Sequence, residues 1–412
     1  MTRRLALDLS PLRQCRDFRL LWAGNLVSLV GKQVTVVAIP YQVYQLTHSA
    51  VAVGLVGLAQ LGPYLLFAAI GGAVADAVDR RRLMLAVQVG LGVLMTGMTT
   101  ASASGVVTLA LLYVVAGLVA ALSAVELPAE SAVIPNLVPA HLLTPALALS
   151  FLQFQASIVV GPALGGLLIA RFGLAPAYGL DAATFAAAIV AIIAIAPQPV
   201  APGPHERPLR SIVEGMAFVR RQGAVMGGFA IDLNAMIFGM PRALFPVLAA
   251  TTYHAGPAGL GLLYSAPGVG AVLGAALSGF VGRLRHLGRA VILSAAVWAL
   301  CIGLFGLSGF SLQVGLVLLA AAGAADMISA ICRNAILQMV TPDRLRGRAS
   351  AAHGMVVVGG PYLGDLRAGS VAGAVGPAIS LASGSAMCLL GIVAVTAAFP
   401  ALRDYVRAAD GP

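Results

Sequence analysis

The feature that most constrains the fold of this chain is a series of long apolar runs along almost its whole length. Of its 412 residues, 59% are hydrophobic and only 10% are charged, whereas a soluble domain carries roughly 25% charged residues. So few charges could not cover a water-facing surface. Each run reaches the roughly 20 apolar residues that a helix needs to cross a bilayer, and such runs are not the alternating strands of a membrane barrel. The sequence therefore predicts an all-α integral membrane protein.

We predict twelve membrane-spanning helices joined by short polar segments. They are expected at 19–46, 50–75, 83–104, 106–127, 142–170, 174–196, 223–252, 257–281, 290–308, 310–333, 349–371 and 375–402. The longest polar gap, 197–223, is too short to bury a core of its own. Its five prolines predict an extended, non-helical linker, which we place at 198–222. We thus expect a six-helix bundle at 19–197, a second at 223–402, and terminal tails at 1–18 and 403–412.

The arginines predict the orientation of the chain. Most of the 25 basic residues fall in the N-terminal tail, the linker, the C-terminal tail and the loops on the same side, whereas the opposite loops hold only Arg171. By the positive-inside rule, both termini and the linker are then cytoplasmic, in the cytoplasmic (inner) membrane of the cell. The net charge of +10 reflects this topology and anionic headgroups, so no nucleic-acid partner is expected. The first apolar run starts at Phe18 and is too long for a cleavable signal peptide.

The two predicted bundles repeat short motifs. The segment from Gly72 to Arg82, after the second span, is echoed from Gly279 to Arg289, after the eighth. Similarly, Val138-Pro139 precedes the fifth span and Thr341-Pro342 precedes the eleventh. Both offsets are a little over 200 residues, which indicates duplication and two pseudo-symmetric bundles, as in several transporter folds.

The loop after the second span carries a recognisable pattern, Gly72-x3-Asp76-x3-Arg80-Arg81. It resembles the loop signature of the major facilitator superfamily, in which the loop latches a gate against the eleventh helix, here near 347–349. This copy departs from that pattern, because Ala77 replaces a basic residue and Asp79 replaces a glycine. The alternative is a basic cytoplasmic loop without a gating role.

A second pattern lies in the fifth span, where Gly161-Pro162 is followed by Gly165-Gly166. It resembles the end of the signature of the superfamily's exporters. The proline bends the helix and the glycines allow close contact with a neighbouring helix. Plain helix packing without a meaning for transport direction is the alternative.

Several segments are similar to the enterobactin exporter branch of that superfamily, among them 207–218, 242–248, 261–268, 302–307 and 346–348. The resemblance implies proton-driven efflux of a siderophore or a similar amphipathic metabolite by a protein that works as a monomer. The same branch includes drug and macrolide exporters, so multidrug efflux is the alternative.

Polar groups inside the membrane are costly and are candidates for function. The first, seventh and tenth spans, which line the central cavity in the superfamily, carry such groups: Lys32, Asp232, Asn234, Arg242, Asp326 and Arg333. Burial makes a carboxylate easier to protonate, so Asp232 is the first candidate for proton coupling and Asp326 the second. Lys32 and Arg242 are candidates for binding an anionic cargo, with Asn234 and Arg333 also in the cavity. Static ion pairs are the alternative for each.

Other charged residues receive a structural interpretation. We expect Glu126 and Glu130, at the predicted end of the fourth span, to pair with loop arginines. Asp181, Asp365 and Arg367 are expected to tie neighbouring helices together.

Two other classes of function fit the sequence less well. A membrane enzyme would need a clustered nucleophile, base or metal set, but the six histidines are scattered and the four cysteines form no CxxC pair. We therefore expect no catalytic residues, no metal, no cofactor and no disulfide framework, and without a P-loop ATP is not the energy source. A non-transporting sensor usually adds a soluble signalling domain, which we do not find. The expected partners are a small-molecule cargo, protons and membrane lipid.

Overall fold

The computed structural model describes residues 8–198, 208–277, 279, 284–309 and 311–407, and the regular elements in these residues are helices. The N-terminal part holds α1 (Ser10–Gln14), α2 (Arg16–Thr47), α3 (Ala50–Ala77), α4 (Arg80–Ala103), α5 (Leu109–Leu137), η1 (Ala140–Leu142), α6 (Leu143–Phe172) and α7 (Leu174–Ala194). The C-terminal part holds α8 (Pro208–Arg221), α9 (Gly223–Gly239), η2 (Arg242–Leu244), α10 (Phe245–Val247), η3 (Leu248–Thr252), α11 (Gly256–Ala276), α13 (Leu287–Leu307), α14 (Leu312–Val340), α15 (Asp343–Val375), α16 (Pro377–Ala398) and α17 (Pro400–Arg403).

The predicted all-α membrane fold is confirmed. Within the described residues, eleven helical segments are long and apolar enough to cross a membrane. The twelfth crossing is α15, which has 33 residues but more charges than the others, and which packs against α3 and α9.

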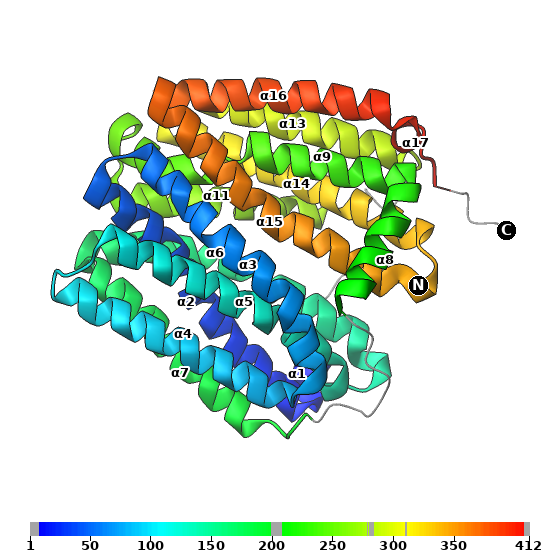
Figure 1. Cartoon of the computed structure of the whole chain (residues 1–412), viewed down its shortest axis with the longest axis horizontal. Coiled ribbons are helices and arrows are strands. Elements are labelled where there is room, and N and C mark those ends of the chain that lie inside the picture. Colours follow the sequence, from blue (N-terminus) through cyan, green and yellow to red (C-terminus); the bar gives the residue numbers. More distant parts are fainter. Residues whose placement is uncertain (1–7, 199–207, 278, 280–283, 310, 408–412) are drawn as a thin grey trace.

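The helices form two bundles that lie side by side (Figure 1). We call α2–α7 the N-half, drawn from blue to green in the lower part of the figure, and α9–α16 the C-half, drawn from green to red above it. The short helices α1, α8 and α17 lie at one end of the bundles, at the right. We call this the α8 end and the opposite one the far end.

Glycines bring the two halves together toward the far end. The contacts between the halves are made chiefly by α3 with α15 and by α6 with α11. A Cβ atom on Gly166 would lie 2.4 Å from the carbonyl oxygen of Pro257, and one on Gly54 would lie 2.8 Å from that of Asp365. Only glycine permits backbones to approach so closely, so these positions fix how the halves meet.

The structure corrects three sequence predictions about the elements. The linker is not extended throughout, because Pro208 to Arg221 form α8, which packs on the start of α15. The fourth span does not end at 127: α5 continues through Pro128 and Pro135 to Leu137, as prolines in membrane helices allow when neighbouring helices support the backbone. The seventh span breaks after Gly239, at Pro241, and resumes through η2, α10 and the π-helical turn η3.

Candidate transport site

A cavity of about 700 Å³ lies between the two halves. Its wall comes mostly from helices α2 to α7 of the N-half, with η2, α11 and α15 contributing from the C-half. Aromatic side chains are prominent in this wall: Tyr64, Phe151, Phe154, Phe185, Tyr264 and Tyr362. Its lining residues on α5 and α6 fall in the parts of these helices nearer the α8 end. The volume and the mixture of apolar and polar groups are typical of sites for small molecules.

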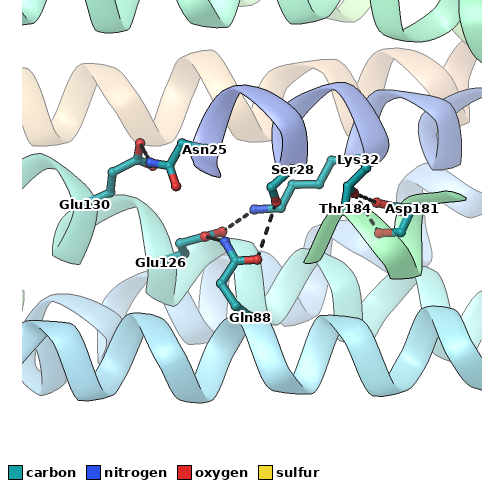
Figure 2. Close-up of polar contacts among 8 residues, drawn as sticks. All are labelled: Asn25, Ser28, Lys32, Gln88, Glu126, Glu130, Asp181 and Thr184. Atoms are coloured by element: carbon teal, nitrogen blue, oxygen red, sulfur yellow. Dashed lines mark hydrogen bonds and ion pairs between the residues drawn. The ribbon is translucent and has the colours of Figure 1, made fainter. Parts of the chain in front are cut away.

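The N-half contributes a cluster of charged residues to this cavity, Lys32, Glu126, Glu130 and Asp181, which we call the N-half cluster. Figure 2 shows Lys32 reaching from α2 toward Glu126 on α5, and its Nζ donates a hydrogen bond to Oε2 of that glutamate at 2.5 Å. The other oxygen, Oε1, accepts from Nε2 of Gln88 at 2.5 Å. The Lys32 ammonium also lies 5.7 Å from the centre of the Phe185 ring, a favourable cation–π distance.

The remaining two carboxylates of the cluster have neutral partners. Asn25 donates from Nδ2 to Oε1 of Glu130 at 2.6 Å. Asp181 accepts from the hydroxyl groups of Thr35 at 2.5 Å and of Thr184 at 3.4 Å. Within the described residues, no cationic nitrogen lies within 4.0 Å of either carboxylate. The cluster therefore carries one cation for three carboxylates.

Glu126 and Glu130 do not pair with loop arginines, contrary to the sequence prediction. The prediction failed because α5 continues past Pro128 and carries both glutamates along the cavity wall. Asp181, expected to be only structural, also lies on this wall.

A second ion pair lies on the part of the cavity wall that the C-half contributes. The guanidinium Nη2 of Arg242 lies 2.8 Å from Oδ2 of Asp365, and Oδ1 of Asp365 accepts from the backbone N–H of Ala243 at 3.2 Å. Asp365 thus ties α15 to η2, and it also lines the cavity. Lys32 and Arg242 both line the cavity, and each is paired with a carboxylate there, as in the static ion-pair alternative.

Four residues of the C-half form a separate group, the C-half cluster: Asp232, Asp326, Arg333 and His353. Nη2 of Arg333 lies 2.7 Å from Oδ1 of Asp232 and 3.9 Å from Oδ1 of Asp326. Nε2 of His353 lies 3.5 Å from Oδ2 of Asp232, and its ring stacks on Phe229. None of the four lines the cavity described above.

The expectation that Asp232, Asp326 and Arg333 share one path with Lys32 is therefore wrong for this cavity. Asp232 is 1% exposed and is directed toward α14 and α15 rather than toward the N-half. Asn234 does not line the cavity either. Its side chain turns toward α16, where Nδ2 donates to the carbonyl oxygen of Cys388 at 2.8 Å.

The arginines of the predicted gating loop hold helices of the N-half. Nε and Nη2 of Arg81 donate to the carbonyl oxygens of Ile192 and Ile193 at 2.8 and 2.5 Å, at the C-terminal end of α7, where cations are stabilising. Nη1 of Arg80 donates to the carbonyl of Ala132 on α5 at 3.3 Å. The described contacts of these two residues are not with α15. The surroundings of Gly72 and of the Asp76 side chain lie outside what the structure describes.

The glycines of the exporter-type motif sit at close helix contacts. A Cβ on Gly161 would lie 2.4 Å from Cβ of Gln33, and one on Gly165 would lie 3.0 Å from Cα of Val34. These two glycines allow α6 to pack closely on α2, and Gly166 allows it to pack closely on α11 of the C-half. Pro162 lies between these contacts, inside α6.

Comparison with known proteins identifies the family of this chain. Residues 6–408 match the family model described as "Transmembrane secretion effector", a model of the major facilitator type. The chain belongs to the major facilitator superfamily. It is 30% identical over 396 residues to the enterobactin exporter EntS of Shigella boydii serotype 18, covering 94% of this chain and 93% of that protein, and equally similar to EntS of Escherichia coli O139:H28. The resemblance to the enterobactin exporter branch is thereby confirmed.

Solved structures agree on the fold. The nucleoside transporter NupG superposes with a TM-score of 0.70 at 15% identity, covering 95% of this chain and 100% of that one. A POT family transporter in complex with 5-aminolevulinic acid gives a TM-score of 0.73 at 11% identity, covering 94% and 97%. The family match and the exporter relatives make the chain a multi-pass membrane transporter rather than an enzyme.

Proposed function

We propose that this transporter exports a siderophore or a similar amphipathic small metabolite across the cytoplasmic membrane and is driven by the proton gradient. The observation that carries the proposal is the cavity of about 700 Å³ between the halves, with aromatic walls and charged groups in the membrane interior. Similarity to proteins named as enterobactin exporters supports efflux and a siderophore as the first cargo to test. The aromatic wall also favours a second candidate, multidrug efflux by the same fold.

The proposal includes an orientation. The arginines Arg80, Arg81, Arg220, Arg221, Arg348 and Arg403 all belong to the α8 end, which by the positive-inside rule is the cytoplasmic one. The cavity would then lie on the cytoplasmic side of the glycine contacts that join the halves, in position to load cargo from the cell.

We propose Asp232 as the first proton-coupling residue and Asp326 as the second. Their support is the shared arginine: Arg333 lies 2.7 Å from one and 3.9 Å from the other. Protonation of Asp232 would release Arg333 to Asp326 and loosen the link between α9 and α14. Such a rearrangement of helices is how a proton could drive a change of conformation.

Transport in inside-out vesicles tests the coupling. Cells lacking the gene accumulate the cargo, and vesicles that carry the wild-type protein take it up when the lumen is acidified. Asp232→Asn should abolish this pH-driven uptake while the protein still elutes as a folded species. Asp404→Asn, which removes a carboxylate from the exposed ion pair with Arg403, is the matched control. Intact coupled uptake in Asp232→Asn would remove this residue from the mechanism.

The cargo is tested by profiling metabolites in the medium. A deletion strain grown with low iron should secrete less siderophore than its parent, and the gene in trans should restore secretion. An unchanged siderophore pool, together with increased sensitivity to amphipathic antibiotics, would favour multidrug efflux instead.

A further inference from the structure

The wall of the transport cavity has an excess of negative groups. Its described lining holds four carboxylates, Glu126, Glu130, Asp181 and Asp365, against two cations, Lys32 and Arg242. Each cation is already within 2.8 Å of one carboxylate. Glu130 and Asp181 are left with hydrogen bonds from neutral groups only.

Such an imbalance has a consequence in the membrane interior. An unpaired ionised carboxylate is costly there, so it takes up either a proton or another cation. The hydrogen bond from Asn25 orients Glu130 but supplies no charge. The two carboxylates therefore make the cavity a site for positive charge.

Glu130 is the more accessible of the two. It is partly exposed on the cavity wall. Asp181 is only 1% exposed and accepts hydrogen bonds from two threonine hydroxyl groups. The same wall presents Phe151 and Phe154, whose ring faces attract cations as well as apolar groups. A cargo with a cationic head and an apolar body would satisfy both kinds of surface.

Resting on the proposed export function, we infer that the cavity selects cargo with a cationic group, which binds at the Glu130 carboxylate in competition with a proton. Asp181 adds negative potential without touching the cargo. The charged groups that act on this carboxylate are Glu126 on its own helix and Lys32 on α2. On the other helices packed against α5, Tyr64 of α3 lines the same cavity and Arg80 of α4 donates to the backbone carbonyl of Ala132. Lys32 is committed to Glu126 at 2.5 Å, so it leaves Glu130 open to an incoming cation.

A pair of probes of nearly equal shape and opposite charge tests this inference. Tetraphenylphosphonium and tetraphenylborate are offered to the purified full-length protein in detergent, with empty micelles as the blank for partition. The cation should bind at pH 8 at least tenfold more tightly than the anion. Its affinity should fall at pH 6, because protons compete for the same carboxylate.

Variants connect the binding to Glu130. Glu130→Gln keeps the size and the acceptor for Asn25 but loses the charge, so cation affinity should fall at least tenfold and its pH dependence should disappear. Glu130→Asp should keep the pH dependence with altered affinity, which excludes misfolding as the cause. Asp404→Asn, outside the cavity, should bind like the wild type. Equal binding of the two probes, or unchanged cation binding by Glu130→Gln, would overturn the inference.

These outcomes are independent of the export proposal. If the deletion strain fails to secrete a metabolite but the purified protein prefers neither probe, the proposed export function is supported. The inference that the cargo carries a cationic group is then wrong. If the protein prefers the cation and Glu130→Gln abolishes that preference, but no vesicle transports any cargo, the site stands and the export function is wrong.

Discussion

Two polar contacts occupy corresponding places in the two halves of this transporter, yet their charges differ. In the N-half, Asn25 on the first helix donates to Glu130 on the fourth at 2.6 Å. In the C-half, Arg333 on the fourth helix pairs with Asp232 on the first at 2.7 Å. One contact joins an amide to a carboxylate and is net negative, whereas the other joins two opposite charges.

The correspondence follows the internal repeat. The offset is 207 residues from Gly72 to Gly279 and 203 residues from Pro139 to Pro342. The same offsets relate the contacts: 207 residues separate their first-helix partners, at 25 and 232, and 203 separate their fourth-helix partners, at 130 and 333. Each half thus has a polar link between its first and fourth helices at corresponding positions of the repeat, and the two links differ in charge.

The difference indicates a division of labour between the halves. The N-half link lines the cavity with an unbalanced carboxylate, so its charge is available to cargo. The C-half link is buried away from that cavity and balanced by its own arginine, so its charge holds helices together and can act only if the pair separates. Substitutions in the two clusters should therefore have very different effects on stability.

The largest effect is expected for Arg333→Gln. Removing the arginine leaves Asp232 buried without a cation, and breaking a buried ion pair costs about 3–5 kcal/mol. Thermal unfolding in detergent should show a marked drop in midpoint. The double variant Asp232→Asn with Arg333→Gln should regain much of the loss, because the fully buried carboxylate is then replaced by a neutral amide. A single variant as stable as the wild type would contradict the view that this pair holds the C-half together.

A smaller effect is expected for Lys32→Met. This variant removes the ammonium group that pairs with Glu126. The glutamate keeps its hydrogen bond from Gln88 but loses its charged partner. An unsatisfied buried group costs about 1–3 kcal/mol of stability. The cost is limited because Glu126 lies on the wall of a cavity rather than in the packed core. Adding Glu126→Gln should restore stability. A loss as large as that of Arg333→Gln would show that the N-half cluster is also structural.

The sequence predicted the helices well and the partners of their charges poorly. Apolar runs located the twelve spans, and the cost of charge in lipid singled out Lys32 and Arg242, which do line the cavity. The end of the fourth span was predicted too early, because α5 continues through Pro128 to Leu137. Glu130 was expected at the end of the fourth span, within reach of loop arginines, although the repeat could have matched it to Arg333.

Which face of each helix meets which neighbour is decided by tilt and by close glycine contacts between distant segments. The spacing of residues along a helix does not contain this information. Asp232 and Lys32 therefore face different surroundings although their helices correspond in the two halves. For the same reason the sequence did not reveal His353 as a neighbour of Asp232.

The smallest effect on stability is expected for Glu130→Gln, the variant that changes cation binding most. The glutamine carbonyl can still accept the hydrogen bond from Asn25, and no buried partner is left unpaired, so the free energy of unfolding should change by only about 0.5 kcal/mol, as at sites without such partners. The measurement is thermal unfolding under the same conditions as for Arg333→Gln, its counterpart in the repeat. A loss of several kcal/mol would mean that Glu130 holds α2 to α5 as Arg333 holds α9 to α14, and the proposed division of labour would then fail. Unchanged stability with weakened cation binding would instead separate the residue that holds the cargo from the one that holds the fold.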